Sequence, residues 1–166
     1  MPLRSIDWKD GVVVIIDQTK IPHELIYEEL RSLEEVGEAI KEMKVRGAPL
    51  IGVAAALGLA LFAKENTSLP RKAFLEKLKE AADYLRGTRP TAVNLQWALE
   101  RILSEAGRAE DPARKVVEEA LRMMEEDIEV NMRLASQGQS LIENGDRILT
   151  HCNTGSLATV SIGTAL

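Results

Sequence analysis

Three short segments of the sequence place an arginine or a cysteine where chemistry on an anion is feasible. The first is Arg46-Gly47-Ala48-Pro49, in which a glycine-containing loop leads into a predicted helix. A helix N-terminus exposes main-chain N–H groups and a positive dipole end, and the planar arginine fork matches phosphate oxygens. The segment therefore predicts an anion-binding loop. A tight connection between two helices, with Arg46 merely solvated, fits the spacing as well.

The second segment is Gly87-Thr88-Arg89-Pro90-Thr91, which again places an arginine just before a predicted helix, with Asn94 one turn further on. The alternative is a capped turn in which Thr88 or Thr91 satisfies main-chain donors. Two arginine loops in one small acidic chain favour a shared phosphate pocket. The sequence does not show whether the two loops converge.

The third segment is Thr150-His151-Cys152-Asn153-Thr154-Gly155, at the end of a predicted short buried strand over 146–152. Ligands of open α/β sheets bind beyond the carboxyl ends of the strands, and a helix starting just after Cys152 would favour its thiolate. Cys152 is thus a candidate catalytic residue, although single cysteines are often buried small hydrophobes. His151 would point to the opposite face of such a strand, which argues against a direct Cys–His pair.

Other kinds of site find little support in the sequence. The two histidines, at positions 23 and 151, and the one cysteine have no paired spacing, so no metal site is expected. Glu125, Glu126, Asp127 and Glu129 are interpreted as a solvated helix face. Neither a Walker-type phosphate loop nor a dinucleotide fingerprint occurs.

The elements that must hold these segments follow from turn signals and apolar spacing. An Asp10-Gly11 pair between apolar runs predicts a hairpin of strands over 6–8 and 12–16. Apolar residues spaced by three and four from Ile26 to Met43 predict an amphipathic helix that begins near Pro22. Further helices are predicted over 50–64, 68–86, 91–106 and 111–144.

These elements predict a mainly α fold of short N-terminal strands and a helical bundle. The chain has 45% hydrophobic but 4% aromatic residues, which suits closely packed helices. Residues 146–166 then resemble the first strand and part of a helix of a Rossmann-like α/β domain. A parallel strand needs neighbours, so we expect one domain over 1–145 and the incomplete start of another over 146–166.

Charge and hydropathy restrict the partners. Twenty-one Lys and Arg against twenty-six Asp and Glu give a net charge of −5, which argues against a nucleic-acid partner. One cysteine cannot form an intrachain disulfide, and a cytoplasmic location is expected. The apolar stretch 49–63 is shorter than the roughly 20 residues that span a bilayer, so we interpret it as a buried core helix and expect no membrane partner.

Four motifs in order carry a resemblance to a known family. They are Ile-Asp-Gln-Thr-Lys-Ile-Pro over 16–22, Val-Arg-Gly-Ala-Pro-Leu-Ile-Gly over 45–52, Arg-Pro-Thr-Ala-Val-Asn-Leu over 89–95 and Leu-Thr-His-Cys-Asn-Thr-Gly over 149–155. The sequence resembles the N-terminal half of methylthioribose-1-phosphate isomerases. These enzymes belong to the superfamily that includes the α, β and δ subunits of initiation factor 2B.

The resemblance implies isomerisation of 5-methylthioribose 1-phosphate to 5-methylthioribulose 1-phosphate in methionine salvage, by an enediol or a hydride-shift route. It implies that Arg46, Gly47 and Ala48 hold the substrate, that Arg89 holds its phosphate side and that Cys152 is the active-site cysteine. It also implies a homodimer and no metal or organic cofactor. The family's acid or base aspartate lies in the C-terminal domain, so this chain alone is expected to be inactive.

Two alternative functions remain open at this stage. One is isomerisation of another sugar phosphate, such as ribose 1,5-bisphosphate. The other is a non-catalytic regulatory subunit of the initiation-factor type, which would have no chemical need for Cys152.

Overall fold

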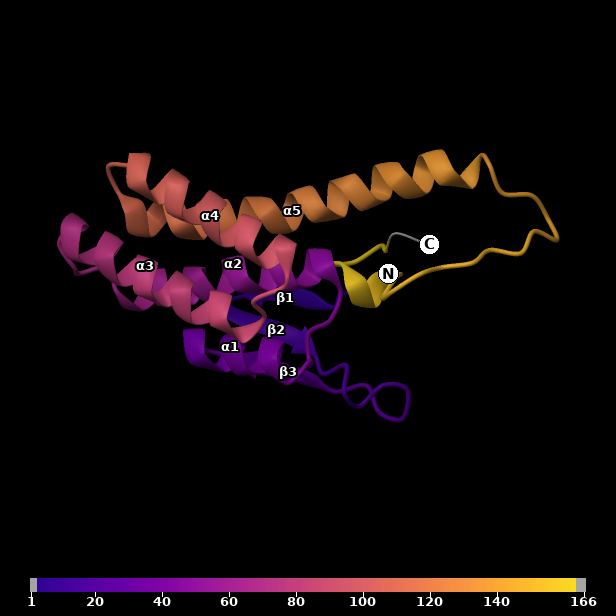
Figure 1. The fold of residues 1–166 in the computed structure, drawn as a ribbon, viewed down its shortest axis with the longest axis horizontal. Coiled ribbons are helices and arrows are strands. Elements are labelled where there is room, and N and C mark those ends of the chain that lie inside the picture. Colours follow the sequence, from indigo (N-terminus) through magenta and orange to yellow (C-terminus); the bar gives the residue numbers. More distant parts are fainter. Residues whose placement is uncertain (1–2, 164–166) are drawn as a thin grey trace.

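The N-terminal region forms a three-stranded antiparallel sheet in the computed structural model, which describes residues 3–163. The strands are β1 (Ile6–Lys9), β2 (Val12–Ile16) and β3 (Tyr27–Leu30), in the order β1-β2-β3 (Figure 1). The predicted hairpin is confirmed, with Lys9 opposite Val12. Asp10 and Gly11, at φ 51° and 79°, make its turn, a conformation that aspartate and glycine tolerate.

The prediction of a long helix that begins near Pro22 is wrong for the first half of that range. Residues 27–30 form β3, with Leu30 opposite Val13 of β2, and the helix α1 begins only at Leu33 (Leu33–Lys41). Ser32 caps this helix by accepting a hydrogen bond from the Glu35 N–H at 3.2 Å. Pairing with β2 satisfies the main-chain N–H and C=O groups of β3. Residues 27–30 therefore form a strand, although the spacing of their apolar side chains alone favours a helix.

The other helices lie close to their predicted ranges. They are α2 (Ala48–Glu65), α3 (Arg71–Thr88), α4 (Val93–Arg108) and α5 (Pro112–Gln139). The Asp111 side chain caps α5 by accepting from the Arg114 N–H at 3.1 Å, as its Asp-Pro start indicates. This last helix ends at Gln139, before the stop expected at Asn144-Gly145.

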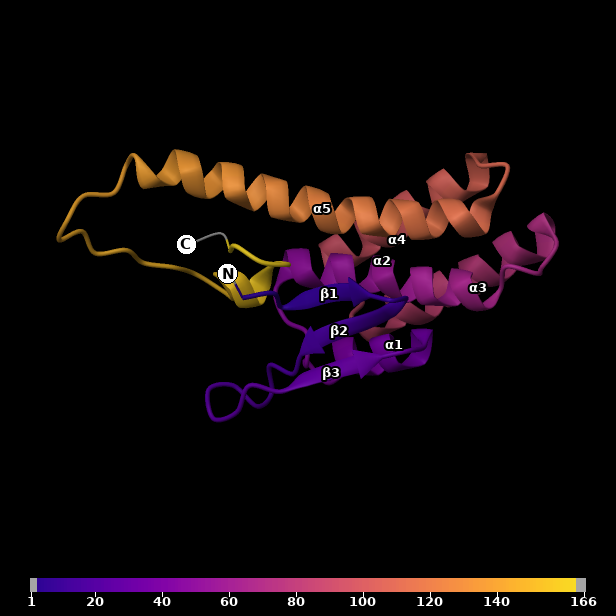
Figure 2. The ribbon, with the colours of Figure 1, turned by 180° about the vertical axis from the view of Figure 1, so that it is seen from behind.

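Helix α2 is the centre of the molecule. The sheet covers the face of α2 opposite α3 and α4, and α5 packs along it as well (Figures 1 and 2). Its small residues allow close approach: a Cβ added to Gly58 would lie 3.1 Å from Val36 Cγ1. By length and composition α2 could cross a membrane, but 72% of it is buried inside this fold. The interpretation of 49–63 as a core helix is confirmed.

The chain after α5 differs from the expectation. Residues 146–150 have no regular secondary structure, and the Leu149 side chain is 97% exposed, so the expected strand over 146–152 is wrong for this structure. A parallel strand is stable only when neighbours bond its main chain, and no other described segment pairs with it. Of the helix expected from Leu157, only a short 3₁₀ turn, η1 (Ser156–Ala158), is present among the described residues, and 164–166 lie outside them.

Candidate functional site

The two arginine loops lead into neighbouring helix ends. Helices α2 and α4 begin at the same end of the molecule, where η1 also lies (Figure 1). The two helices pack closely near these ends, because a Cβ added to Gly52, the fifth residue of α2, would lie 3.0 Å from the carbonyl oxygen of Asn94, the second residue of α4. Neither N-terminus has a side-chain cap. Free N–H groups and two positive dipole ends therefore converge beside the loops that carry Arg46 and Arg89.

Gly47 is the N-cap of α2 and could not be replaced without strain. Its φ is +96°, and a Cβ there would lie 2.4 Å from Ala158 Cα and 2.7 Å from the Ala158 carbonyl oxygen. The loop before α2 is thus in direct main-chain contact with the segment that follows Cys152. Ala48, the first residue of α2, is exposed at this end of the helix.

The half-buried Arg46 side chain is held by the loop after β2. Its Nη2 donates to the Gln18 carbonyl oxygen at 2.9 Å. Its Nε is buried and has no hydrogen-bond partner among residues 3–163. An unpaired buried donor costs about 1–3 kcal/mol. Arg89 follows α3, is half-buried, and its carbonyl oxygen accepts from the Ala92 N–H at 3.0 Å in the turn before α4.

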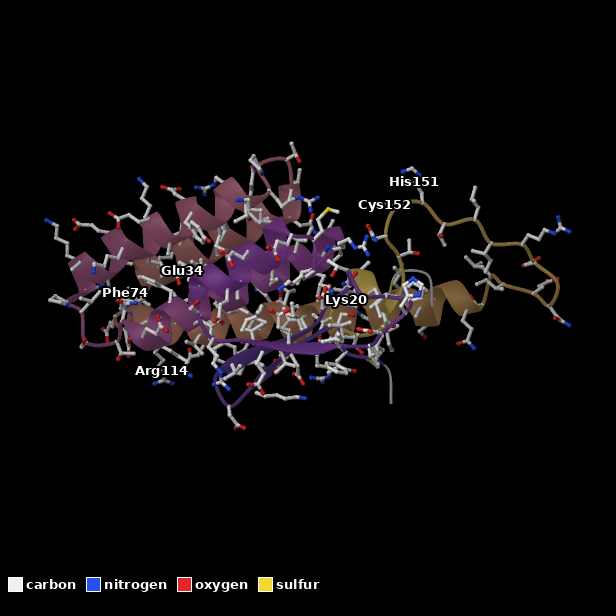
Figure 3. All side chains as sticks on the ribbon, turned by 90° about the horizontal axis from the view of Figure 1, so that it is seen from below. Lys20, Glu34, Phe74, Arg114, His151 and Cys152 are labelled. Carbon is white, nitrogen blue, oxygen red and sulfur yellow. The ribbon has the colours of Figure 1, made fainter. Side chains whose placement is uncertain are left out.

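Cys152 lies on the connection between α5 and η1, not at the end of a strand. Figure 3 shows Cys152 beside His151 on this connection, which extends beyond the helical bundle. Both residues are exposed, and Cys152 has φ +64°. The helix expected just after the thiol is reduced to the three residues of η1, so it offers no full helix dipole. The alternative interpretation of Cys152 as a buried small hydrophobic residue is also wrong, because the residue is exposed.

The segment after Cys152 is held by three side chains that sequence reasoning missed. The Ser5 Oγ donates to the Ser156 carbonyl oxygen at 2.6 Å, and the Gln18 Nε2 donates to that of Leu157 at 2.7 Å. The Asp127 Oδ2 accepts from the Val160 N–H at 2.8 Å. These partners are separated by up to 151 positions in sequence. The polar residues of the 16–22 motif were a signal for Gln18, whereas nothing in the sequence marked Asp127.

Asp127 corrects the interpretation of the acidic residues of α5 as a simple solvated face. Burial raises the pKa of its carboxyl above the ordinary range, and hydrogen bonds from the Val160 N–H and Asn131 offset part of that rise. Glu126 is also half-buried, and it receives two hydrogen bonds from Arg101, at 2.6 and 2.8 Å. Glu125 and Glu129 are exposed, as predicted.

A cavity of about 330 Å³ opens beside the start of α2. Pro49 and Gly52 of α2, Asn94 and Trp97 of α4, and Asp127 of α5 are among its walls, together with several aliphatic side chains. An organic molecule bound at the converging helix ends would have room there. Within residues 3–163, no group of three or more His, Cys, Asp or Glu side chains could hold a metal ion.

Residues 44–165 match the sequence profile of the Initiation factor 2 subunit family. The chain belongs to this family. Its curated relatives include the methylthioribose-1-phosphate isomerase of Desulforudis audaxviator, which is 48% identical over 170 residues, or 100% of this chain and 49% of the relative. The 5-deoxyribose 1-phosphate isomerase of Moorella thermoacetica is 45% identical over 170 residues, or 99% of this chain and 48% of the relative.

Solved structures of the family have the same fold. The crystal structure of 5-methylthioribose 1-phosphate isomerase from Pyrococcus horikoshii matches with a TM-score of 0.89 and 44% identity, over 98% of this chain and 47% of that one. The delta subunit of translation initiation factor eIF-2B from A. fulgidus matches with a TM-score of 0.83 and 47% identity, over 96% of this chain and 47% of that one. The chain thus spans about half the length of the family members it matches. The expected mainly α fold is confirmed.

Proposed function

We propose that this chain is the N-terminal part of an aldose–ketose isomerase that converts 5-methylthioribose 1-phosphate to 5-methylthioribulose 1-phosphate in methionine salvage. The observation that carries the proposal is the convergence of two uncapped helix N-termini, each preceded by an arginine loop. A sugar phosphate needs such an anion site, and relatives named for this reaction align over the whole chain.

In this proposal Arg46, Gly47 and Ala48 hold the substrate and Arg89 binds on the phosphate side. The Nε of Arg46 is a buried donor without a hydrogen-bond partner among the described residues. A bound anion that accepts a hydrogen bond from this Nε would remove the free-energy cost of the unpaired donor. Gly47 lets the main chain come close to the ligand and to Ala158 at once. Cys152 is the catalytic thiol.

The described residues supply one side of a reaction that needs two. Moving a hydrogen between C1 and C2 of the sugar requires groups on both sides of the reacting carbons and exclusion of water. Cys152 is exposed in this structure. We therefore propose that residues 146–166 begin a second, Rossmann-like domain which follows the 1–145 domain and provides the acid or base. Without it we expect no turnover.

The proposed enzyme works on a small sugar phosphate in the cytoplasm as a homodimer. It uses no metal or organic cofactor and has no nucleic-acid or membrane partner. The net charge of −5 supports the exclusion of nucleic acid, because a positive surface is the usual footprint of such binding.

The test is an isomerase assay on the full gene product that contains this chain, beside Cys152→Ser and, as a matched control, His151→Ser on the same exposed connection. We expect turnover of 5-methylthioribose 1-phosphate by the unchanged protein and by His151→Ser, and a loss of at least about a hundredfold for Cys152→Ser. Full activity of Cys152→Ser would remove the role assigned to the thiol.

Two alternatives are favoured by particular relatives. The Moorella relative is named for 5-deoxyribose 1-phosphate, so a different sugar phosphate, ribose 1,5-bisphosphate included, belongs in the same assay. The A. fulgidus structure is named as an initiation-factor subunit, which supports a regulatory role. A substrate panel separates these: turnover of one sugar phosphate identifies the enzyme, and turnover of none favours the regulatory subunit.

A further inference from the structure

Gln18 lies between the Arg46 loop, which binds the substrate in the proposed function, and the segment that follows the proposed catalytic thiol, Cys152. Gln18 follows β2 and is 2% exposed. Its carbonyl oxygen accepts from Arg46 Nη2 at 2.9 Å, and its side-chain Nε2 donates to the Leu157 carbonyl oxygen at 2.7 Å. Its N–H donates to the Lys44 carbonyl oxygen at 3.0 Å. One buried residue thus contacts both the Arg46 loop and the segment that follows Cys152.

The conformation of Gln18 is set by its neighbours in sequence. The Asp17 carboxylate accepts from the Thr19 N–H at 2.9 Å and from the Thr19 hydroxyl at 2.6 Å, which closes a tight turn around Gln18. Asp17 is itself 5% exposed. Burial raises the pKa of Asp17, but the Thr19 hydrogen bonds and the charges of Lys44 and Lys20 lower it overall, so the turn keeps an ionised acceptor.

The two loops that Gln18 joins also touch directly. The Gly47 Cα faces Ala158 so closely that no side chain fits between them. A rotation of the Gln18 amide would leave the Leu157 carbonyl without its donor and would loosen the segment against Gly47. A single hydrogen bond of this kind is enough to bias the position of a loop but not to decide the fold.

We propose that Gln18 is a positioning residue that sets Arg46 and the Cys152-bearing loop at a fixed separation. The inference rests on the proposed isomerase function. Through its carbonyl Gln18 orients the guanidinium that binds the substrate, and through its amide it holds Leu157, five residues after the thiol. Replacing the amide leaves the carbonyl contact with Arg46 in place. Substrate binding is then retained while the alignment with Cys152 is lost.

The first experiment measures steady-state kinetics of the full gene product with Gln18→Met, which keeps the side-chain length but removes the donor. We expect kcat to fall about 10- to 100-fold, since misplacement by about 1 Å costs up to about a hundredfold, with KM within about threefold. The control is Asn66→Leu, which removes an amide donor to the Phe62 carbonyl at the opposite end of α2. Its kcat should match that of the unchanged protein. All rates are taken well below the unfolding temperature of each variant.

A second variant, Gln18→Glu, distinguishes positioning from a general loss of structure. A protonated glutamic acid can donate to the Leu157 carbonyl, whereas the ionised form repels it. Charged groups around this position include Arg46, whose guanidinium donates to the Gln18 carbonyl, and the preceding residue Asp17, whose carboxylate is influenced by the charges of Lys44 and Lys20. We expect the ratio of the Gln18→Glu rate to the unchanged rate to rise at least about fivefold as pH falls through the pKa of the introduced acid. The same ratio for Gln18→Met should stay flat.

A measurement on the 166-residue chain separates this inference from the proposed function. Hydrogen–deuterium exchange of a peptide over 156–163 should speed up in Gln18→Met and not in Asn66→Leu. If the full protein turns over no sugar phosphate, the proposed function fails, and the exchange result alone decides whether Gln18 holds the loop. Unchanged exchange, unchanged kcat, or a ratio for Gln18→Glu that does not respond to pH would each overturn the inference.

Discussion

Replacing Gly47 with alanine tests whether the loop before α2 and the segment after Cys152 are packed as closely as the structure has them. The new methyl group would lie 2.4 Å from Ala158 Cα and 2.7 Å from its carbonyl oxygen, far inside van der Waals contact. It would also sit on a residue with φ +96°, where an L side chain is strained. Both effects act on the folded state.

The size of the effect follows from these two causes. The backbone conformation costs a residue with a side chain about 1–2 kcal/mol, and overpacking against main-chain atoms adds about 1–3 kcal/mol. If the segment instead moves away, the clash is relieved, but the segment loses its hydrogen bonds with Ser5, Gln18 and Asp127, each worth about 0.5–1.5 kcal/mol. The first route predicts a loss of about 2–5 kcal/mol. In the second the backbone cost remains beside the lost hydrogen bonds, which gives about 2.5–6.5 kcal/mol. We therefore expect a loss of about 2–6 kcal/mol, or about 4–24 °C in Tm for a chain of this size.

Thermal and urea unfolding followed by circular dichroism measure this loss. The matched control is Gly107→Ala near the end of α4, where no atom lies within 4 Å of the added Cβ. We expect that control to be neutral or slightly stabilising, because alanine favours a helix over glycine. A Gly47→Ala variant as stable as Gly107→Ala would refute the close contact between Gly47 and Ala158.

Three further predictions concern ionisable groups. The pKa of Asp127 is raised in the folded state, so ionisation of this carboxyl destabilises the fold as pH rises from about 4 towards the folded-state pKa. Urea titrations should therefore show that Asp127→Asn gains stability relative to the unchanged chain over that pH interval. The Glu119 carboxylate is 1% exposed and accepts a hydrogen bond from Arg101 at 2.6 Å. Burial raises its pKa, but hydrogen bonds from Arg122 and Arg101 outweigh burial and lower the pKa overall. Glu119→Gln should cost about 3 kcal/mol near neutral pH, progressively less as pH falls below about 4.5, while Glu118→Gln in an exposed pair should change little. In the full protein, Arg89→Met should raise KM for the sugar phosphate at least about tenfold with a smaller effect on kcat, and an unchanged KM would contradict a phosphate role for Arg89.

Local patterns were sufficient for most of the bundle. The apolar run of α2, the Asp111-Pro112 start of α5 and the Asp10-Gly11 turn each depend on residues close together in sequence, and all three elements were predicted. The residues around Leu30 were not, because spacing by three and four fits a helix while their main chain pairs with β2. Pairing between distant segments outweighed a local pattern.

The residues of the candidate site also fall into those that the sequence marks and those that only the folded structure shows. Arg46, Gly47 and Arg89 stand out in the sequence because glycine, arginine and proline near a helix start have a known use in anion binding. Gln18 lies in the 16–22 motif, but nothing in the sequence shows that its side chain contacts Leu157, which is 139 positions away. Asp127 is not marked at all, and its partner Val160 is 33 positions away. Hydrogen bonds over such separations exist only once the chain is folded.

The sequence by itself determined the four helices of the bundle, the hairpin and the two arginine loops, because helix caps, turn residues and apolar periodicity act over a few residues. Only the tertiary structure decided that α2 and α4 begin side by side, with Gly52 close to Asn94, and that the chain after Cys152 packs on Gly47. It also left residues 146–150 without strand structure. The physical reason is common to all three: each depends on whether a partner distant in sequence is present to satisfy main-chain groups or to fill space.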